Sequence, residues 1–129
     1  MNIHILTIGD ELLIGQIIDT NSAWMARRLN LQGAAVTGIT TVGDDLPDIL
    51  AALRDAWREA DVVLMTGGLG PTKDDITKKA LAEFFDTSLA FHQPTYDRIV
   101  RIFEQLGRQV SAAHRYQAYH PEGADLLRN

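Results

Sequence analysis

The sequence predicts an α/β fold in which parallel strands alternate with helices. Apolar runs at residues 3–8, 34–42 and 61–66 each lead into a turn with glycine, and aspartate follows in every one. A stretch with the periodicity of a helix comes after each run, and this repeated order is typical of a mostly parallel sheet covered by helices. Because ligands of such sheets bind outside the carboxyl ends of the strands, we expect the three turns to gather around one cleft.

Composition points to one compact globular domain over residues 1–129. The chain is 46% hydrophobic and 22% charged, and it is long enough to bury a sizeable core. It has no cysteine, which excludes disulfides, thiolate metal sites and a cysteine nucleophile. No apolar run approaches the ~20 residues of a membrane helix, and the start lacks the features of a secretory signal. We therefore expect a cytoplasmic location and no membrane partner.

The net charge argues against DNA or RNA as a partner. Lysine and arginine number 12 against 17 acidic residues, which gives a formal charge of −5, and the basic residues are scattered. Nucleic-acid binding depends on clustered lysine and arginine that neutralise phosphates. An acidic protein can still hold an anionic small molecule locally, through backbone N–H groups or a bound cation.

The first strand and the first helix each have a local cause. Residues 3–8 are rich in branched side chains, which predicts a strand buried on both faces that ends at Gly9-Asp10-Glu11. A helix is predicted over residues 23–31, and Gly33 is a suitable end for it. Side chains that can cap this helix precede it at Asp19, Thr20 and Asn21.

The next strand and helix repeat this order. Residues 34–42 predict a strand that ends at Gly43-Asp44-Asp45. A helix follows over residues 47–60, because Pro47 suits a first helical turn and apolar side chains recur on one face. The third strand, at residues 61–66, then enters a glycine-rich turn.

The second half of the chain is predicted to be mainly helical. Helices are expected over residues 77–85 and 94–106, with a short one over 111–119. Pro121-Glu122-Gly123 is typical of a turn, and residues 124–127 could begin a strand.

Large apolar side chains on the predicted helix faces are interpreted as core contacts. They include Trp24 and Trp57, and on the helix over residues 94–106 they are Ile99, Ile102, Phe103 and Leu106. The four histidines show no metal-binding spacing, so they are interpreted as structural or surface residues.

The turn after the third strand carries the chemistry that the sequence suggests most directly. Glycines at 67, 68 and 70 let the backbone turn sharply and approach a ligand. The N–H groups of this turn and of the following helix can then point at phosphate oxygens. The adjacent carboxylates Asp74 and Asp75 suit a divalent cation between protein and phosphate. The alternative is that Asp74 or Asp75 caps the helix.

Four ordered blocks of the sequence carry a family resemblance. They are Thr7-Ile8-Gly9-Asp10-Glu11-Leu12-Leu13-Ile14-Gly15, Asp19-Thr20-Asn21-Ser22, Thr41-Val42-Gly43-Asp44-Asp45 and residues 66–77. Together they closely resemble the N-terminal domain of CinA proteins, the competence/damage-inducible family, and residues 115–124 fit the same domain. That domain belongs to the molybdopterin-binding superfamily of MogA and MoaB. The resemblance implies a three-layer α/β/α sandwich. In this family the N-terminal domain continues beyond the position that matches Asn129, which implies that the chain is either truncated at its C-terminus or a shortened member of the family.

The resemblance also implies function. CinA N-terminal domains are associated with hydrolysis of ADP-ribose to AMP and ribose 5-phosphate, with a divalent cation such as Mg²⁺, Mn²⁺ or Co²⁺. Cofactor-synthesis relatives bind or adenylylate molybdopterin, and they have threonine where this chain has Leu69, which favours the pyrophosphatase interpretation. The alternatives are a domain that binds molybdopterin or a nucleotide without turnover, and a regulatory or scaffold domain. Relatives assemble as dimers or trimers, which implies a homo-oligomer.

The resemblance assigns roles to particular residues. Asp44 and Asp75 match the two characteristic acidic positions of the superfamily and are predicted to be catalytic. The divalent cation would be held by carboxylates drawn from Asp10, Asp44, Asp74 and Asp75. Substrate phosphates would be bound by Thr66, Gly67, Gly68, Leu69, Gly70, Thr72 and Asn21. The alternative for Asp10 and Asp44 is a turn-forming or capping carboxylate. Asn21 could cap a helix, and Asp74 is the best suited of the four aspartates to capping alone.

Overall fold

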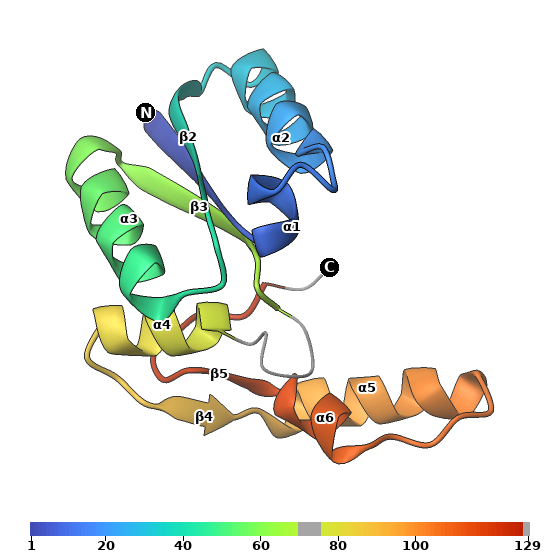
Figure 1. Cartoon of the computed structure of the whole chain (residues 1–129). Coiled ribbons are helices and arrows are strands. Elements are labelled where there is room, and N and C mark those ends of the chain that lie inside the picture. Colours follow the sequence, from blue (N-terminus) through green and yellow to red (C-terminus); the bar gives the residue numbers. More distant parts are fainter. Residues whose placement is uncertain (70–75, 128–129) are drawn as a thin grey trace. The chain divides into compact units, whose positions relative to one another are not determined.

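The computed structural model describes residues 1–69 and 76–127. The chain forms two compact units, Met1–Leu69 and Gly70–Asn129, which run from blue to green and from yellow to red in Figure 1. The expectation that residues 1–129 make a single domain stays a prediction.

The first unit contains a parallel sheet whose strands end together. Its elements are β1 (Asn2–Ile8), α1 (Asp10–Leu13), α2 (Thr20–Leu31), β2 (Ala35–Val42), α3 (Leu46–Glu59) and β3 (Val62–Gly67). The strand order is β2-β1-β3, and both pairs are parallel. Ile8 at the end of β1 pairs with Val42 on one side and with Gly67 on the other. The turns that follow the three strands therefore leave the same edge of the sheet.

Helices cover both faces of this sheet. The step from β1 to β2 and the step from β2 to β3 run in opposite directions across the sheet, so right-handed connections put their helices on opposite faces. Figure 1 shows α3 on one side and α1 and α2 on the other. This confirms the predicted three-layer α/β/α arrangement with a parallel sheet.

The core of the first unit lies between β1 and α3. Ile5, Leu6 and Ile8 of the central strand are buried, which agrees with the continuous apolar run. Ile49 and Leu53 of α3 are buried as well. Complete burial of side chains of this size stabilises the fold by roughly 1.5–3 kcal/mol each, so β1 and α3 hold the carboxyl edge of the sheet in place.

The second unit joins three helices to a small antiparallel sheet. Its elements are α4 (Ile76–Phe84), β4 (Leu89–Phe91), α5 (Gln93–Gln105), α6 (Ala112–Tyr116) and β5 (Tyr119–Pro121). β4 pairs with β5, and Ala80 and Ala82 of α4 are buried. The guanidinium of Arg115 lies 4.3 Å from the centre of the Phe91 ring, which ties α6 to β4.

The structure corrects several predicted elements of this half. Residues 124–127 form no strand. The helix predicted over residues 111–119 ends at Tyr116, because Tyr119 begins β5. The strands β4 and β5, each three residues long and half-buried, were not predicted, since so short a run shows no alternation. The one-turn helix α1 was also missed.

The prediction that the apolar helix faces are core contacts is wrong for several side chains. Trp24 is 64% exposed and Trp57 is 53% exposed. In α5 no residue is buried: Ile99 and Phe103 are half-buried, whereas Ile102 and Leu106 are exposed. Helical periodicity shows that a helix has an apolar face, but it does not show which part of that face another element covers. Across the described ranges 1–69 and 76–127, none of the helices has the length and apolar character needed to cross a bilayer.

Candidate functional site

The turns after β1 and β2 are joined by two aspartates. The backbone N–H of Asp44 donates to Oδ1 of Asp10 at 3.0 Å, and the N–H of Asp10 donates to Oδ2 of Asp44 at 3.4 Å. Both residues are exposed. The structure thus places side by side, at the carboxyl edge of the sheet, two of the carboxylates predicted to hold a cation.

Gly43 permits this pairing. A Cβ atom at residue 43 would overlap Oδ1 of Asp10, the oxygen that accepts from Asp44. The N–H of Gly9 donates to the carbonyl oxygen of Val42 at 2.9 Å, which extends the β1–β2 ladder up to the paired turns. Glycine at 43 is therefore part of the geometry that brings the two carboxylates together.

The turn after β3 begins with two glycines in the left-handed region. Gly67 has φ 91° and Gly68 has φ 61°. A Cβ atom at Gly67 would overlap the carbonyl oxygen of Ile8 on the neighbouring strand. Glycine is required at this position both for its conformation and for the close approach of two backbones. Leu69, at the end of the described part of the turn, is exposed.

A cavity of about 210 Å³ lies at the ends of β1 and β3. Its wall also includes residues of α1, of the loop that follows α1 and of the start of α2. Among the predicted phosphate-binding residues, the cavity brings together Asn21, Thr66 and Gly67. Asp19, on the same wall, caps α2 by accepting from the N–H of Ser22 at 2.9 Å. Asn21 is thus the second helical residue, because Asp19 takes the capping role.

Some cavity residues were not predicted from the sequence. Glu11 lines the cavity, whereas its neighbour Asp10 does not. Ile17 and Ile18 also line it. The signal for Glu11 was present, as a carboxylate directly after a buried strand. No sequence pattern indicated Ile17 or Ile18, because their contact with the cavity depends on how the loop after α1 folds back.

The carboxylate oxygens of Asp10 and Asp44 suit a cation that also binds a phosphate. No group of three or more histidine, aspartate or glutamate residues that could hold a metal ion occurs in residues 1–69 and 76–127. Within these residues, no hydrogen bond uses the second carboxylate oxygen of Asp10 or of Asp44. Magnesium is commonly bound by one or two carboxylates together with substrate phosphates, so the pair fits such a cation. Gly70, Thr72, Asp74 and Asp75, which complete the predicted site, lie outside the described residues.

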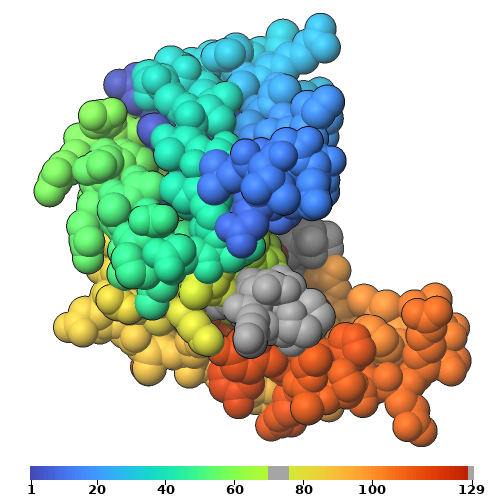
Figure 2. Space-filling model, viewed as in Figure 1, coloured from blue at the N-terminus to red at the C-terminus, as the bar shows by residue number. Residues whose placement is uncertain are grey.

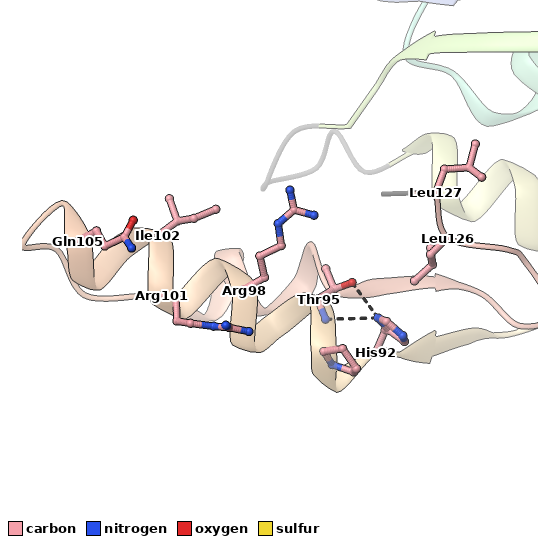
Figure 3. A pocket seen from close by; sticks show the side chains of 9 residues that line it. His92, Thr95, Arg98, Arg101, Ile102, Gln105, Leu126 and Leu127 are labelled. Carbon is pink, nitrogen blue, oxygen red and sulfur yellow. Dashed lines mark hydrogen bonds between the residues drawn. The ribbon is translucent and has the colours of Figure 1, made fainter. Parts of the chain in front are cut away.

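A larger cavity, of about 610 Å³, belongs to the second unit (Figure 3). His92, Thr95, Arg98 and Arg101 line it, and none of them was predicted as a site residue. The Nδ1 atom of His92 accepts from the N–H of Thr95 at 3.3 Å, so this histidine caps α5. Its structural role agrees with the interpretation made from the sequence.

Comparison with known families and sequences gives consistent matches. A family model described as "Probable molybdopterin binding domain" matches residues 4–119. A "Putative competence-damage inducible protein" of Clostridium acetobutylicum is 40% identical over 129 residues, and a "CinA-like protein" of Dictyoglomus thermophilum is 43% identical over 129 residues. The match covers 100% of this chain and 31% of each relative, so the chain spans about a third of their length.

Solved structures agree with these matches. A CinA protein of unknown function from Thermoplasma acidophilum superposes with a TM-score of 0.82 and 29% identity, over 95% of this chain and 71% of that one. MoaB from Pyrococcus furiosus, a tungsten cofactor synthesizing protein, superposes with a TM-score of 0.62 and 28% identity, over 82% of this chain and 64% of the other. The structural similarity therefore includes a CinA protein and a MoaB protein, the two groups that the sequence resembles.

Proposed function

Since the chain belongs to the family of probable molybdopterin-binding domains, with curated relatives of the CinA type, we propose that it hydrolyses ADP-ribose with the help of a divalent cation. The observation that carries the proposal is the reciprocal pairing of Asp10 and Asp44 at the edge of the sheet that also bears the cavity. A pair of exposed carboxylates beside a glycine turn suits a cation-bound pyrophosphate better than a bare phosphate.

The groups on the cavity wall would bind and orient the substrate. The pyrophosphate would lie against the end of β3, where Thr66 and Gly67 line the cavity. The Thr66 hydroxyl and the Asn21 amide are donors that both line the cavity, and they would fix two of the phosphate oxygens. Gly68 and Leu69 would add to these phosphate contacts, as would Gly70 and Thr72, which lie outside the described residues.

Asp10 and Asp44 would hold the cation, with Asp75 and Asp74 as further ligands from the turn. When bound, such a cation neutralises charge that develops on phosphate and makes a bound water more acidic. In the overall reaction the oxygen of water bonds to one phosphorus, and the bond from that phosphorus to the bridging oxygen breaks. AMP and ribose 5-phosphate leave, the bridging oxygen stays with the second phosphorus, and the two protons of the water pass to the product phosphates or to solvent.

The test is chromatographic detection of AMP after the purified chain is incubated with ADP-ribose and Mg²⁺, Mn²⁺ or Co²⁺. EDTA should abolish release. Asp44→Asn and Asp75→Asn should each reduce turnover by about a hundredfold or more, because each removes a charge that the proposal needs. In Asp44→Asn the amide oxygen can still accept from the N–H of Asp10, so folding should persist.

Asp61→Asn is the matched control. Oδ2 of Asp61 accepts from the N–H of Asn2 at 2.7 Å, so Asp61 also is an exposed carboxylate bonded to backbone, but at the opposite end of the strands. Its turnover should equal that of the unmodified chain. Full activity in both Asp44→Asn and Asp75→Asn would contradict the proposed roles.

A second candidate function is binding of molybdopterin or a nucleotide without turnover. It is favoured by the description of the matched family and by the similarity to MoaB at 28% identity. Saturable binding of AMP or molybdopterin by a chain that releases no AMP from ADP-ribose, with any of the three cations, would support this function over hydrolysis.

A further inference from the structure

The loop between α1 and α2 exposes isoleucines beside the cavity of the first unit. Ile14 is 68% exposed, Ile17 is 56% exposed and Ile18 is 83% exposed. Figure 2 shows this part of the chain, in blue, open on the surface. Exposed aliphatic side chains grouped at a polar cavity are candidates for contact with the apolar part of a ligand.

The side chains that line the cavity come from different elements. Ile17 and Ile18 belong to the loop side, which also contributes Asp19, whereas Thr66 and Gly67 come from the end of β3. Ile14 lies in the same segment but does not line the cavity. A ligand with a flat apolar ring at one end and phosphate at the other could contact the two isoleucines and the end of β3 together.

The loop side is held in shape by backbone hydrogen bonds. The N–H groups of Gln16 and Ile17 donate to the carbonyl oxygen of Glu11, at 3.0 and 3.3 Å, and the N–H of Thr20 donates to that of Ile18 at 2.8 Å. Gly15 supplies the turn with φ 74°. Ile17 and Ile18 are therefore presented by an ordered backbone, which reduces the entropy that a ligand must overcome on binding.

The volume limits what the cavity can hold. About 210 Å³ is less than the roughly 300–1,000 Å³ of pockets that enclose a drug-sized ligand, so the cavity accommodates one part of a dinucleotide-like molecule. Covering the two isoleucines with a planar base removes apolar surface from water, which favours binding of the part that carries the base.

We propose that Ile17 and Ile18 form the face on which the adenine base of the substrate packs, with the adjoining phosphate directed toward Thr66 and Gly67. The inference rests on the proposed function, since it assigns the AMP half of ADP-ribose to this cavity. It makes the two isoleucines specificity residues: they distinguish AMP, which carries the base, from ribose 5-phosphate, which does not.

The test compares the Kd values of AMP and ribose 5-phosphate by titration calorimetry. The double variant Ile17→Ser/Ile18→Ser should bind AMP about tenfold more weakly than the unmodified chain, and it should bind ribose 5-phosphate equally well. Ile14→Ser is the matched control, because it removes from the same segment, outside the cavity, an isoleucine whose exposure lies between those of Ile17 and Ile18. It should leave both affinities unchanged. All three side chains are exposed, so the variants should fold, which circular dichroism checks.

The outcomes separate this inference from the proposed function. If the chain binds AMP through the isoleucines but releases no AMP from ADP-ribose, the proposed hydrolysis is contradicted and the packing of the base is not. If the chain hydrolyses ADP-ribose but the double variant binds AMP with the same Kd as the unmodified chain, the packing of the base is contradicted and the hydrolysis is not. Equal losses for AMP and ribose 5-phosphate, or the same loss in Ile14→Ser, would also overturn the packing.

Discussion

Gly67 and Gly33 both have positive φ angles, of 91° and 79°, but their surroundings differ. Nothing lies within 4 Å of a Cβ atom added at Gly33, whereas one added at Gly67 would overlap the carbonyl oxygen of Ile8. Gly33→Ala should therefore cost only the left-handed strain, about 1–2 kcal/mol in the free energy of unfolding. Gly67→Ala adds a backbone displacement and should cost at least about 3 kcal/mol.

Urea denaturation of the two variants measures this difference. Equal losses would mean that β1 and β3 can separate at this point without cost. A backbone shift at Gly67 also moves the cavity wall, so Gly67→Ala should weaken AMP binding while Gly33→Ala should not.

At the scale of elements, the start of α2 couples helix stability to the cavity. Asp19 caps the helix through the N–H of Ser22, and both Asp19 and Asn21 line the cavity. Asp19→Ala should lower the free energy of unfolding by about 1 kcal/mol and weaken AMP binding, because the first turn of α2 loosens. Asp19→Asn retains a capping oxygen and should restore the stability. An Asp19→Asn variant as unstable as Asp19→Ala would contradict capping as the cause.

The helix faces give a second prediction at this scale. Leu53 of α3 is buried, and Leu53→Ala should cost about 2–5 kcal/mol in the free energy of unfolding. Trp24 of α2 is mostly exposed, and its ring lies 5.8 Å from the Arg28 guanidinium. Trp24→Ala should cost no more than about 1 kcal/mol, the value of an exposed cation–π contact. A loss for Trp24→Ala as large as that for Leu53→Ala would show that Trp24 is covered in solution.

At the scale of the whole molecule, ligand binding should protect one unit more than the other. AMP at a hundred times its Kd stabilises the state that binds it by about 2.7 kcal/mol. The cavity is built from the first unit, so amide hydrogen exchange should slow in residues 8–21 and at the end of β3. Mass spectrometry of exchange with and without AMP checks this. Stronger protection of α5 than of residues 8–21 would contradict the proposed location of the site.

The assembly of the chain stays a prediction at this same scale. The family resemblance implies a dimer or trimer, and the first unit and α5 both expose large aliphatic side chains, which contact between copies would cover. Sedimentation velocity should therefore give a mass two or three times 14.3 kDa. A monomer across micromolar concentrations would contradict it.

Local patterns were sufficient to predict most of the elements. The continuous apolar run of β1, the cap before α2 and Pro47 in the first turn of α3 are each signals within a few residues, and the structure confirms the elements that they predict. The strands β4 and β5 were not predicted, because the formation of a three-residue strand depends on its partner across the ladder rather than on its own sequence.

The sequence by itself determined the α/β fold, the glycine and aspartate turns that follow β1 and β2, the glycine turn after β3, and the family, because periodicity and turn chemistry are encoded locally. Only the tertiary structure decided that Asp10 and Asp44 exchange backbone hydrogen bonds, since their strands are neighbours only after folding. It also decided that Glu11, Ile17 and Ile18 face the cavity and that Trp24 remains exposed. Such contacts join residues distant in sequence, or depend on which part of an apolar face is covered, and no local pattern specifies them.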